Sequence, residues 1–548
     1  MGPNAGGGTI ATPEPPPTEC DVAIVGAGAS GAAAAWRLSR AGLDVVCLEQ
    51  GDHAARDRIP TEDDDWEWTR LGAWHPNPNV RDLATDYPVL ADTSPIQPLM
   101  FNGVGGSTVM WSCHLPRFHH SDFRMASLDG VGDDWPLRYD ELAPYYDLNE
   151  RMTGVAGLAG DPAYPPLPER QTLPAPLGPA GERVAAAFDR LGWSWWPADL
   201  ALNTVTHDGR GACNHCGPCE LGCPHRAKSS VDLTYWPKAL KQGARLLIGA
   251  RVETIEVDKQ HRAKAVIWRD RSGAAHRLGA HTVMLAANGV GTPRLLFVSA
   301  NGRWPNGLAN RSGLVGRRLM LHPLARVTGR FGEPVFGHRG IAAGVLVSHH
   351  FYETDPARGF ARGIKLQLLR SHGPLMVALG STLPRLDWGN GHHGRFEDVF
   401  DHTAGLSICV DDLPEVDNRI VLDDSRTDSS GLPAARMIYR VGENSRRALD
   451  FGMARAREAL TEAGSVELYD QPIIADAGFH LMGTARMGDD PETSVTDRWG
   501  QCHDVRNLWV IDGSLFVTAA AVNPTHTLQA LALRAADRLI ETRRGIAA

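Results

Sequence analysis

A strand, a glycine-rich turn, a helix and a second strand follow one another near the amino terminus, and this order constrains the fold more than any other feature. Residues 22–25 are a short apolar run, and residues 26–31 read Gly-Ala-Gly-Ala-Ser-Gly. Residues 32–41 have helical spacing, and a second apolar run over 44–48 ends in Glu49. The segment is therefore predicted to be a βαβ unit, which indicates an α/β domain.

The glycine-rich turn is predicted to bind a dinucleotide. Gly26 permits the tight turn, Gly28 lets a pyrophosphate approach the backbone, and Gly31 lets the helix pack against the strand. The helix amino terminus, with Ser30, faces the phosphates, and Glu49 can accept the ribose hydroxyls. NAD-binding and FAD-binding proteins share this spacing, and glycine-rich turns of unrelated α/β proteins can imitate it, so the motif alone does not choose a cofactor.

Composition excludes some functions. The 548 residues are 43% hydrophobic and 22% charged, which is typical of a globular chain with more than one domain. A net charge of −9 without a long Lys/Arg run argues against nucleic-acid binding. No apolar run is long enough for a transmembrane segment. Residues 1–19 are rich in Gly and Pro and read as a disordered arm, not a signal peptide. We expect a cytoplasmic protein, with export alongside a partner subunit left open.

The middle of the chain has a different character. Residues 243–284 look like a meander of strands, and residues 320–425 alternate strand-like runs with polar turns. The second region predicts a mainly antiparallel sheet that could form one wall of a substrate cavity, and a helix is expected over 445–463. The first and last segments are therefore expected to build one domain, and the middle another.

Four later segments add a resemblance to a known family. Their sequences are Gly-Val-Gly-Gly-Ser-Thr (103–108), Ala-Ala-Asn-Gly-Val-Gly-Thr-Pro (286–293), His-Leu-Met-Gly-Thr-Ala-Arg-Met-Gly (480–488), and Val-Ile-Asp-Gly with Val-Asn-Pro-Thr (510–513 and 522–525). With the first glycine motif, they resemble in order the flavin-binding and catalytic segments of the glucose–methanol–choline (GMC) oxidoreductase family. The resemblance spans nearly the whole chain and implies FAD as the cofactor.

The implied fold is an α/β FAD-binding Rossmann-like domain plus an α+β substrate domain with a mainly antiparallel sheet. The FAD-binding domain is expected over 20–52, 96–125, 226–320 and 488–548, and the substrate domain over 126–225 and 321–487. Beyond the first motif, the resemblance implies these cofactor-binding residues: Gly105, Gly106, Ser107, Met110, Ala287, Asp512, Gly513, Pro524 and Thr525.

The resemblance also implies a catalytic pair, His480 and Asn523. Oxidising an alcohol with a flavin removes a proton from O–H and a hydride from C–H. Histidine is suited to take the proton near neutral pH, and a second polar group must orient the hydroxyl. His526, three residues after Asn523, reads as a structural residue at a helix start and is given no role.

The expected reaction is oxidation of an alcohol to a carbonyl by hydride transfer to flavin N5. The nearest likeness is to pyranose-oxidase-like and FAD sugar dehydrogenase branches, which favours a secondary hydroxyl of a sugar, glycoside or cyclitol. A sterol or long-chain alcohol oxidase, and a non-catalytic electron-transfer flavoprotein, remain as alternatives. A nicotinamide-dependent dehydrogenase would share only the first glycine motif.

Four cysteines in a short loop at 213–224 could serve electron transfer. Cys213, Cys216, Cys219 and Cys223 have the C-x2-C-x2-C-x3-C-P spacing of bacterial iron–sulfur proteins. Four thiolates also suit zinc, and metal-free cysteines are the third reading. A cluster would favour a cytochrome as electron acceptor, whereas O₂ or a quinone could take electrons directly from the flavin.

Met110 leads to a prediction about how FAD is held. In the pyranose oxidase loop that residues 104–118 resemble, this position carries the histidine that bonds covalently to the flavin, and a thioether cannot form that bond. FAD should therefore be bound without a covalent link, and acid precipitation should leave yellow FAD in the supernatant. Flavin fluorescence that stays with the denatured chain would contradict this.

Overall fold

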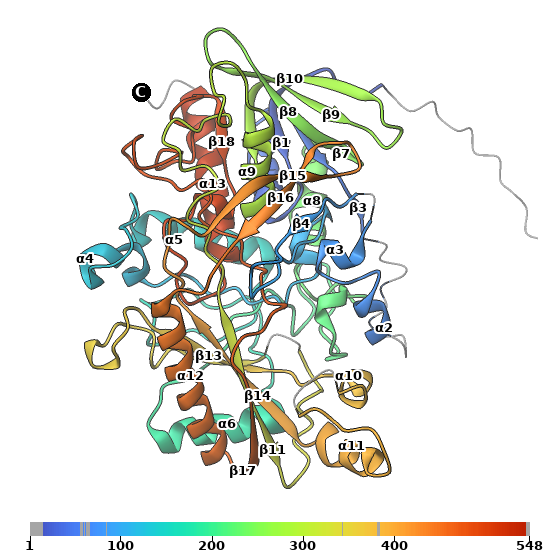
Figure 1. Cartoon of the computed structure of the whole chain (residues 1–548), viewed down its shortest axis with the longest axis vertical. Coiled ribbons are helices and arrows are strands. Elements are labelled where there is room, and N and C mark those ends of the chain that lie inside the picture. The colour runs from blue at the N-terminus through green and yellow to red at the C-terminus, as the bar shows by residue number, and fades with distance from the viewer. Residues whose placement is uncertain are drawn as a thin grey trace, which may run out of the picture.

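The computed structural model describes residues 15–54, 59, 61, 66–83, 85–341, 344–380 and 384–543. The first 14 residues of the arm predicted over 1–19 lie outside these ranges, and the first strand, β1 (Glu19–Val25), already begins at the last residue of that arm. Figure 1 shows a molecule built on two main sheets, one in the upper and one in the lower half of the view.

The upper sheet has seven strands, and its parallel part contains the predicted βαβ unit. Its strand order is β7-β2-β1-β10-β9-β8, with β18 also paired to β10. The strands after β1 are β2 (Val45–Glu49), β7 (Arg245–Ile248), β8 (Arg251–Val257), β9 (Ala263–Arg269), β10 (Ala275–Leu285) and β18 (Leu508–Val510). Val25 pairs with both Leu48 and Leu285, so three parallel strands end side by side. Ligands of open α/β sheets bind at this carboxyl edge.

Burial on both faces explains why β1 is apolar without alternation. Val22 and Ile24 pack into a core with α1 (Ala29–Arg40) and α13 (Thr525–Arg543), while Ala23 and Val25 pack into a second core on the other face. Strands of covered parallel sheets are hydrophobic throughout for this reason. The predicted meander after residue 243 is confirmed for β8, β9 and β10, which pair antiparallel, but β7 pairs parallel with β2.

The lower sheet is antiparallel in every pairing, as expected for residues 320–425. Its order is β17-β11-β14-β13-β12-β6. The strands are β6 (Trp196–Pro197), β11 (Leu324–Phe331), β12 (Leu346–Ser348), β13 (Ile364–Leu369), β14 (Thr403–Val410) and β17 (Ser465–Gln471). Helix α12 (Glu443–Glu462) packs against the sheet, and α6 (Gly178–Leu191) packs against α12. Arg326, Gln367 and Leu369 line a cavity on the uncovered side.

Shorter elements connect the two main sheets. Further strands are β3 (Asp52–His53), β4 (Val89–Leu90), β5 (Gly103–Val104), β15 (Arg419–Thr427) and β16 (Pro433–Ile438). Further α-helices are α2 (Trp66–Leu71), α3 (Pro78–Arg81), α4 (Met125–Asp129), α5 (Tyr139–Thr153), α7 (Val231–Thr234), α8 (Trp236–Lys241), α9 (Asn288–Val298), α10 (Pro374–Ala378) and α11 (His392–Phe400). The 3-10 turns are η3 (Gly106–Val109), η4 (His120–Phe123), η5 (Cys219–Leu221), η6 (Pro356–Arg358) and η7 (Gly513–Leu515).

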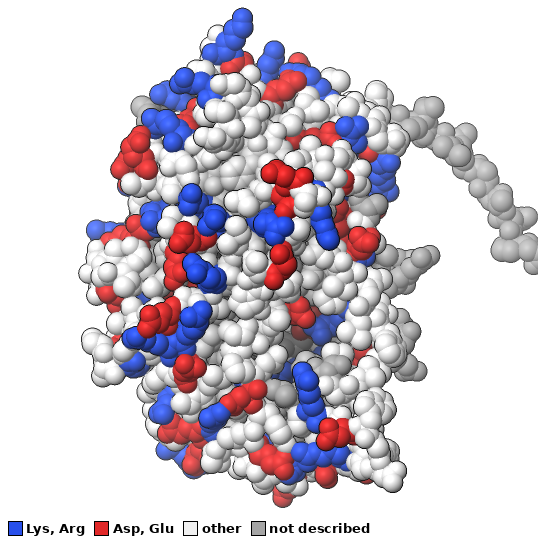
Figure 2. Space-filling model, in the orientation of Figure 1, with Lys and Arg blue, Asp and Glu red and all other residues white. Residues whose placement is uncertain are grey.

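The outer surface carries both charges. On the face shown in Figure 2, Lys and Arg lie interspersed with Asp and Glu. Within the ranges that the structure covers, no helix has the length and hydrophobicity needed to cross a membrane.

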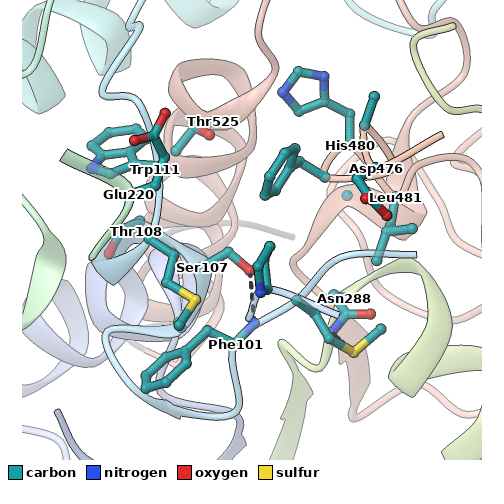
Figure 3. Close-up of a pocket in the computed structure, with 18 of the residues that line it drawn as sticks. Phe101, Ser107, Thr108, Trp111, Glu220, Asn288, Asp476, His480, Leu481 and Thr525 are labelled. Atoms are coloured by element: carbon teal, nitrogen blue, oxygen red, sulfur yellow. Dashed lines mark hydrogen bonds between the residues drawn. The ribbon is translucent and has the colours of Figure 1, made fainter. Parts of the chain in front are cut away.

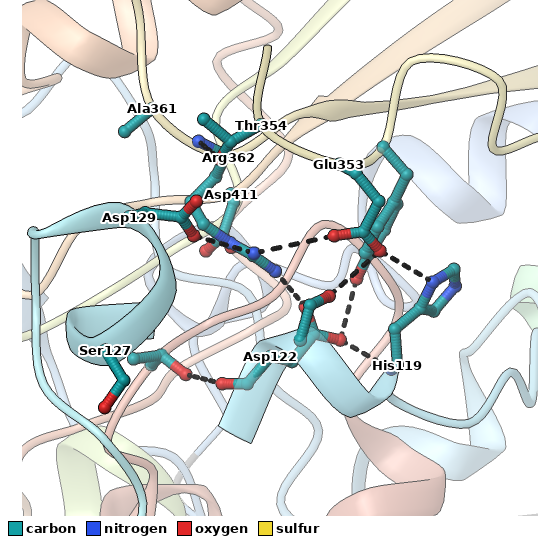
Figure 4. Close-up of polar contacts among 12 residues, drawn as sticks. His119, Asp122, Ser127, Asp129, Glu353, Thr354, Ala361, Arg362 and Asp411 are labelled. Atoms are coloured by element: carbon teal, nitrogen blue, oxygen red, sulfur yellow. Dashed lines mark hydrogen bonds and ion pairs between the residues drawn. The ribbon is translucent and has the colours of Figure 1, made fainter. Parts of the chain in front are cut away.

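A buried arginine joins the lower sheet to the turns near residue 122 (Figure 4). The Arg362 side chain is 1% exposed, and its Nε donates to Asp411 Oδ2 at 3.0 Å. Its Nη1 donates to Asp129 Oδ2 at 3.0 Å, and its Nη2 pairs with Asp122. Burial raises the pKa of Asp411 to about 7, although the guanidinium opposes that shift. One cation therefore holds three carboxylates from separate segments.

This network extends to a loop that precedes α13. Asp122 Oδ2 accepts from the Tyr352 hydroxyl at 2.9 Å, and that hydroxyl oxygen accepts from the Ala521 amide at 3.2 Å. The Asp122 carbonyl oxygen also accepts from Thr518 Oγ1 at 3.0 Å. Hydrogen bonds to Asp122 and Tyr352 thus connect the loop over 518–521 to the Arg362 network.

Removing the Arg362 guanidinium should destabilise the protein strongly. Arg362→Met leaves three buried carboxylates without their cation, and breaking a buried pair costs about 3–5 kcal/mol of unfolding free energy. Urea unfolding followed by fluorescence measures this. Arg447→Met is the control, because Arg447 pairs with Glu443 at the surface, where such pairs contribute about 1 kcal/mol or less. Equal stability of the two variants would contradict the role given to Arg362.

Candidate active site

A single cavity of about 950 Å³ connects the carboxyl edge of the upper sheet with the open face of the lower sheet. Side chains that are far apart in the sequence face it. Figure 3 shows Phe101 and Ser107 on one side, Trp111 and Glu220 on another, and His480 with Asp476 across from them. Its volume is at the upper end of the range typical of cofactor and ligand sites.

The first glycine motif forms one end of this cavity. Gly26 has φ of +105°, and a Cβ there would lie 2.5 Å from the Ala286 carbonyl oxygen, so only glycine fits. Gly28 is the N-cap of α1 and supplies no side-chain cap, so the first amides of this helix are directed to the cavity end without a side-chain acceptor. A helix amino terminus of this kind binds phosphate.

Glu49 is buried at the same edge. Its Oε2 accepts from the Ala27 amide and its Oε1 from the Gly51 amide, both at 2.9 Å. Burial raises the pKa of Glu49, although these amides counteract the rise. Each carboxylate oxygen keeps a further lone pair, as binding of ribose hydroxyls requires.

The second glycine-rich loop lies directly against the first. A Cβ at Gly106 would lie 2.7 Å from the Gly28 Cα, so the two glycines let the loops touch. Ser107 Oγ accepts from the Phe101 amide at 3.3 Å (Figure 3), and Met110 is buried and lines the cavity.

Asp512 joins the family-like segment at 286–293 to the segment at 510–513. Its Oδ2 accepts from the Asn288 amide at 2.9 Å and from Thr292 Oγ1 at 2.6 Å, and its Oδ1 accepts from the Ser514 amide at 2.9 Å. Burial raises the pKa of Asp512. Like Asp512, its neighbour Gly513 lines the cavity.

Most of the predicted cofactor residues line one cavity, and the set fits a dinucleotide such as FAD. The lining includes Gly26, Gly28, Ser30, Glu49, Gly106, Ser107, Met110, Ala287, Asp512, Gly513, Pro524 and Thr525. Gly31 and Gly105 are not part of the lining. Gly31 instead supports the turn, because a Cβ there would lie 2.0 Å from the Gly26 carbonyl oxygen.

His480 is hydrogen-bonded to a second histidine that sequence reasoning did not identify. Nδ1 of His480 lies 2.7 Å from Nδ1 of His322, and Nε2 of His322 lies 2.8 Å from the Ala520 carbonyl oxygen. A carbonyl only accepts, so Nε2 of His322 carries the proton and its Nδ1 accepts from His480. Nε2 of His480 is then left with its lone pair.

Asn523 is fixed by a buried lysine that sequence reasoning also missed. Lys365 Nζ donates to Asn523 Oδ1 at 2.6 Å, so the amide turns its Nδ2 towards Nε2 of His480, 3.5 Å away. In the run Ile-Lys-Leu-Gln-Leu at 364–368, alternation assigns Lys365 and Gln367 to one face. Two polar residues on one face of an otherwise apolar strand are the sequence signal that could have identified Lys365 and Gln367 as site residues.

Burial keeps this group of side chains neutral or weakly basic. Burial, with His322 and the Lys365 ammonium, holds the pKa of His480 well below its ordinary 6.5. Burial and Lys365 lower the pKa of His322 to about 4, and burial lowers the pKa of Lys365 to about 8. Both imidazoles are thus neutral at pH 7, and a neutral imidazole can accept a proton.

His526 lies outside the cavity lining. Its two ring nitrogens lie 3.1 Å from the Leu115 carbonyl oxygen and 3.2 Å from that of Tyr146. It therefore tethers the start of α13 to neighbouring backbone.

The four motif cysteines do not form a metal-binding group in this structure. Over the ranges that the structure covers, no three His, Cys, Asp or Glu side chains are grouped so that they could hold a metal ion. The iron–sulfur and zinc predictions thus receive no support from the geometry. The loop nevertheless reaches the cavity, because Glu220 lines it and Lys228 Nζ donates to the carbonyls of Val109, Trp111 and Cys219.

Comparison with known proteins agrees with this arrangement. The sequence profile of GMC oxidoreductases matches residues 24–324 with its amino-terminal part and 414–532 with its carboxyl-terminal part. The chain is 41% identical over 529 residues to the 2-methyl-1,2-propanediol dehydrogenase of Mycolicibacterium austroafricanum, covering 95% of each protein. It is 31% identical to the fructose dehydrogenase large subunit of Gluconobacter japonicus, covering 95% of this chain and 97% of the relative.

A solved structure shares the fold. The formate oxidase of Aspergillus oryzae RIB40, studied for its FAD modification, superposes with a TM-score of 0.63 at 15% identity, covering 96% of this chain and 99% of that one. This chain is therefore an oxidoreductase of the GMC family, and that membership implies FAD as its cofactor.

Proposed function

We propose that this protein oxidises an alcohol to a carbonyl compound, with His480 as the base and Asn523 as the group that orients the substrate. The observation that carries the proposal is the hydrogen-bond chain from Nδ1 of His480 through His322 to the Ala520 carbonyl, because it leaves Nε2 of His480 unprotonated at the cavity wall. FAD, when bound, supplies the acceptor for the hydride that leaves the carbinol carbon.

The two side chains divide the work on the substrate hydroxyl. Nδ2 of Asn523 is directed into the site because Lys365 holds Oδ1, so the amide can donate to the hydroxyl oxygen. The hydroxyl proton passes to Nε2 of His480 as the C–H electron pair departs, and the carbon–oxygen bond becomes double. A fixed donor and a fixed acceptor leave the hydroxyl one productive orientation.

The substrate we propose carries further hydroxyl groups, and its reacting group is a secondary hydroxyl of a sugar, glycoside or cyclitol. Polar side chains on the lower sheet, including Arg326 and Gln367, line the cavity and support this. The relatives named above act on a diol and on a sugar, to judge from their names. No observation favours a sterol or a long-chain alcohol, and the ordered base argues against a non-catalytic flavoprotein.

The electron acceptor is proposed to be a cytochrome, a quinone or O₂. A route through the cysteine loop would need an iron–sulfur cluster, and the described residues form no metal-binding group there. Iron and acid-labile sulfide in anaerobically purified protein would be the evidence for one.

Removing the base should slow the first half of the reaction. His480→Ala should lower the rate of anaerobic flavin reduction by an alcohol by roughly two to four powers of ten, because proton removal loses its acceptor, while FAD stays bound. Asn523→Ala should slow it less, since it removes only an orienting hydrogen bond. Stopped-flow absorbance measures both. His393→Ala, at an exposed position on α11, is the control, and a His480→Ala protein as fast as this control would refute the assignment.

The pH profile should report the environment of His480. The base acts when neutral, so flavin reduction should be lost only as pH falls through a pKa well below 6.5. Lys365→Met removes a cation that contributes to this low pKa, so the acidic limb should move to higher pH. Flavin reduction measured from pH 4.5 to 9 tests this. An acidic limb that stays in place in Lys365→Met would show that Lys365 does not act on His480.

A further inference from the structure

Three polar side chains lie next to one another on adjacent strands of the lower sheet. Arg326 on β11 is directly opposite Ser407 on β14, and Ser407 is directly opposite Gln367 on β13. Residues paired across an antiparallel ladder point to the same face. Arg326 and Gln367 line the cavity that also contains His480. The three residues are here called the polar wall, in which Ser407 lies fully buried between the two cavity-lining side chains.

Each residue of the polar wall has a buried polar atom without a partner among the described residues. These atoms are Nε of Arg326, Oγ of Ser407 and Oε1 of Gln367. Arg326 is 7% exposed and Ser407 is fully buried. Buried polar atoms in native proteins are normally hydrogen-bonded, and leaving one unpaired is unfavourable. Because Arg326 and Gln367 also line the cavity, this wall can receive a ligand with several oxygen atoms.

The guanidinium of Arg326 is held in this position by its neighbours. A Cβ at Gly405 would lie 2.4 Å from Nε and 2.9 Å from Cζ of Arg326, so the guanidinium occupies the space that a side chain at 405 would fill. Nη1 of Arg326 lies 3.2 Å from Nε2 of His372. Burial holds the pKa of His372 well below its ordinary value, and the positive charges of nearby arginines lower it further. This imidazole is therefore neutral and accepts the hydrogen bond.

The charge of Arg326 is not balanced by a carboxylate among the described residues. Arg370, which also lines the cavity, donates from Nη1 to the His338 carbonyl at 2.8 Å, and its Nε is buried without a partner. Asp470 lines the cavity too, but it is paired with Arg457. Asp476, which also lines the cavity, interacts with His75, where its charge opposes the lowering of the imidazole pKa by burial. Burial and the nearby Arg370 lower the pKa of Arg326 to about 10, so it remains charged at neutral pH.

We propose that the polar wall binds a carboxylate of the substrate, so that the preferred substrate is an alcohol carrying an acid group, such as a sugar acid or a hydroxy acid. This rests on the proposed function, since the same molecule must present a hydroxyl to His480. A carboxylate matches the planar guanidinium with two parallel N–H···O bonds and neutralises a charge that is otherwise buried alone. The amide of Gln367, which lines the same cavity, can bind a neighbouring hydroxyl of the substrate.

Matched substrates test the proposal on the FAD-loaded enzyme. Anaerobic flavin reduction is measured with gluconate against sorbitol, glycerate against glycerol, and a methyl glucuronide against the methyl glucoside, and the limiting rate is separated from the apparent Kd. In the unaltered protein, the acid of at least one pair should be preferred by tenfold or more in the ratio of rate to Kd. Arg326→Gln should abolish that preference, mostly through Kd.

Two further variants separate recognition from folding. Arg326→Lys keeps the charge and loses the two-point geometry, so it should retain part of the preference. Gly405→Ala keeps Arg326 but displaces its guanidinium, so it should lose preference like Arg326→Gln. Arg330→Gln is the control on the same strand, because Arg330 is paired with Glu467 and does not line the cavity. FAD content and urea midpoint are measured for every variant.

The outcomes distinguish this inference from the proposed function. Failure of every alcohol in the panel to reduce the flavin would overturn the proposed function. Reduction by neutral alcohols at least as efficient as by their acids in the unaltered protein would overturn the carboxylate site alone, whatever the variants do. An acid preference that survives in both Arg326→Gln and Gly405→Ala would overturn the polar wall as its cause.

Discussion

The buried carboxylate of Asp512 is the interaction on which the site depends most. It accepts hydrogen bonds from the segment at 288–292 and from the turn that it begins, and so it joins the upper sheet to the carboxyl-terminal segment. The turn then pairs with the segment at 480–488, because the Gly483 and Ala485 amides donate to the carbonyls of Gly513 and Ser514. Burial raises the pKa of this carboxyl, and the three donors around it oppose that rise.

The short loop over 518–521 connects the Arg362 network to the His322–His480 pair. On one side, Tyr352 and Asp122 hold it through the Arg362 network. On the other side, the carbonyl oxygens of Ala519 and Ala520 accept hydrogen bonds from Nε2 of His322. The loop thus orients His322 and leads directly to Asn523. The buried carboxylates around Arg362 and the His322–His480 pair at the cavity wall thus belong to one continuous hydrogen-bond network.

Features that depend on local spacing could be predicted from the sequence, whereas contacts between segments far apart in the chain could not. The βαβ unit, the antiparallel sheet and the family follow from glycine spacing, hydrophobic alternation and ordered motifs, so they could be recognised without coordinates. His322, Lys365 and Arg326 belong to none of the motifs. They come next to His480, Asn523 and Ser407 only when the chain folds, the last pair through the register of β11 and β14. The cysteine spacing predicted a cluster that the geometry does not support, because spacing fixes the order of thiols along the chain and not their convergence in space.

The histidine pair also determines how a proton can leave the site. His322 ends on backbone carbonyls, which cannot take a proton onward, so the chain behind His480 is closed as a conduction path. In the proposed reaction, a proton gained at Nε2 must therefore leave through the same face of the imidazole. Burial disfavours the imidazolium, so the release of that proton and the departure of the product would share the same cavity.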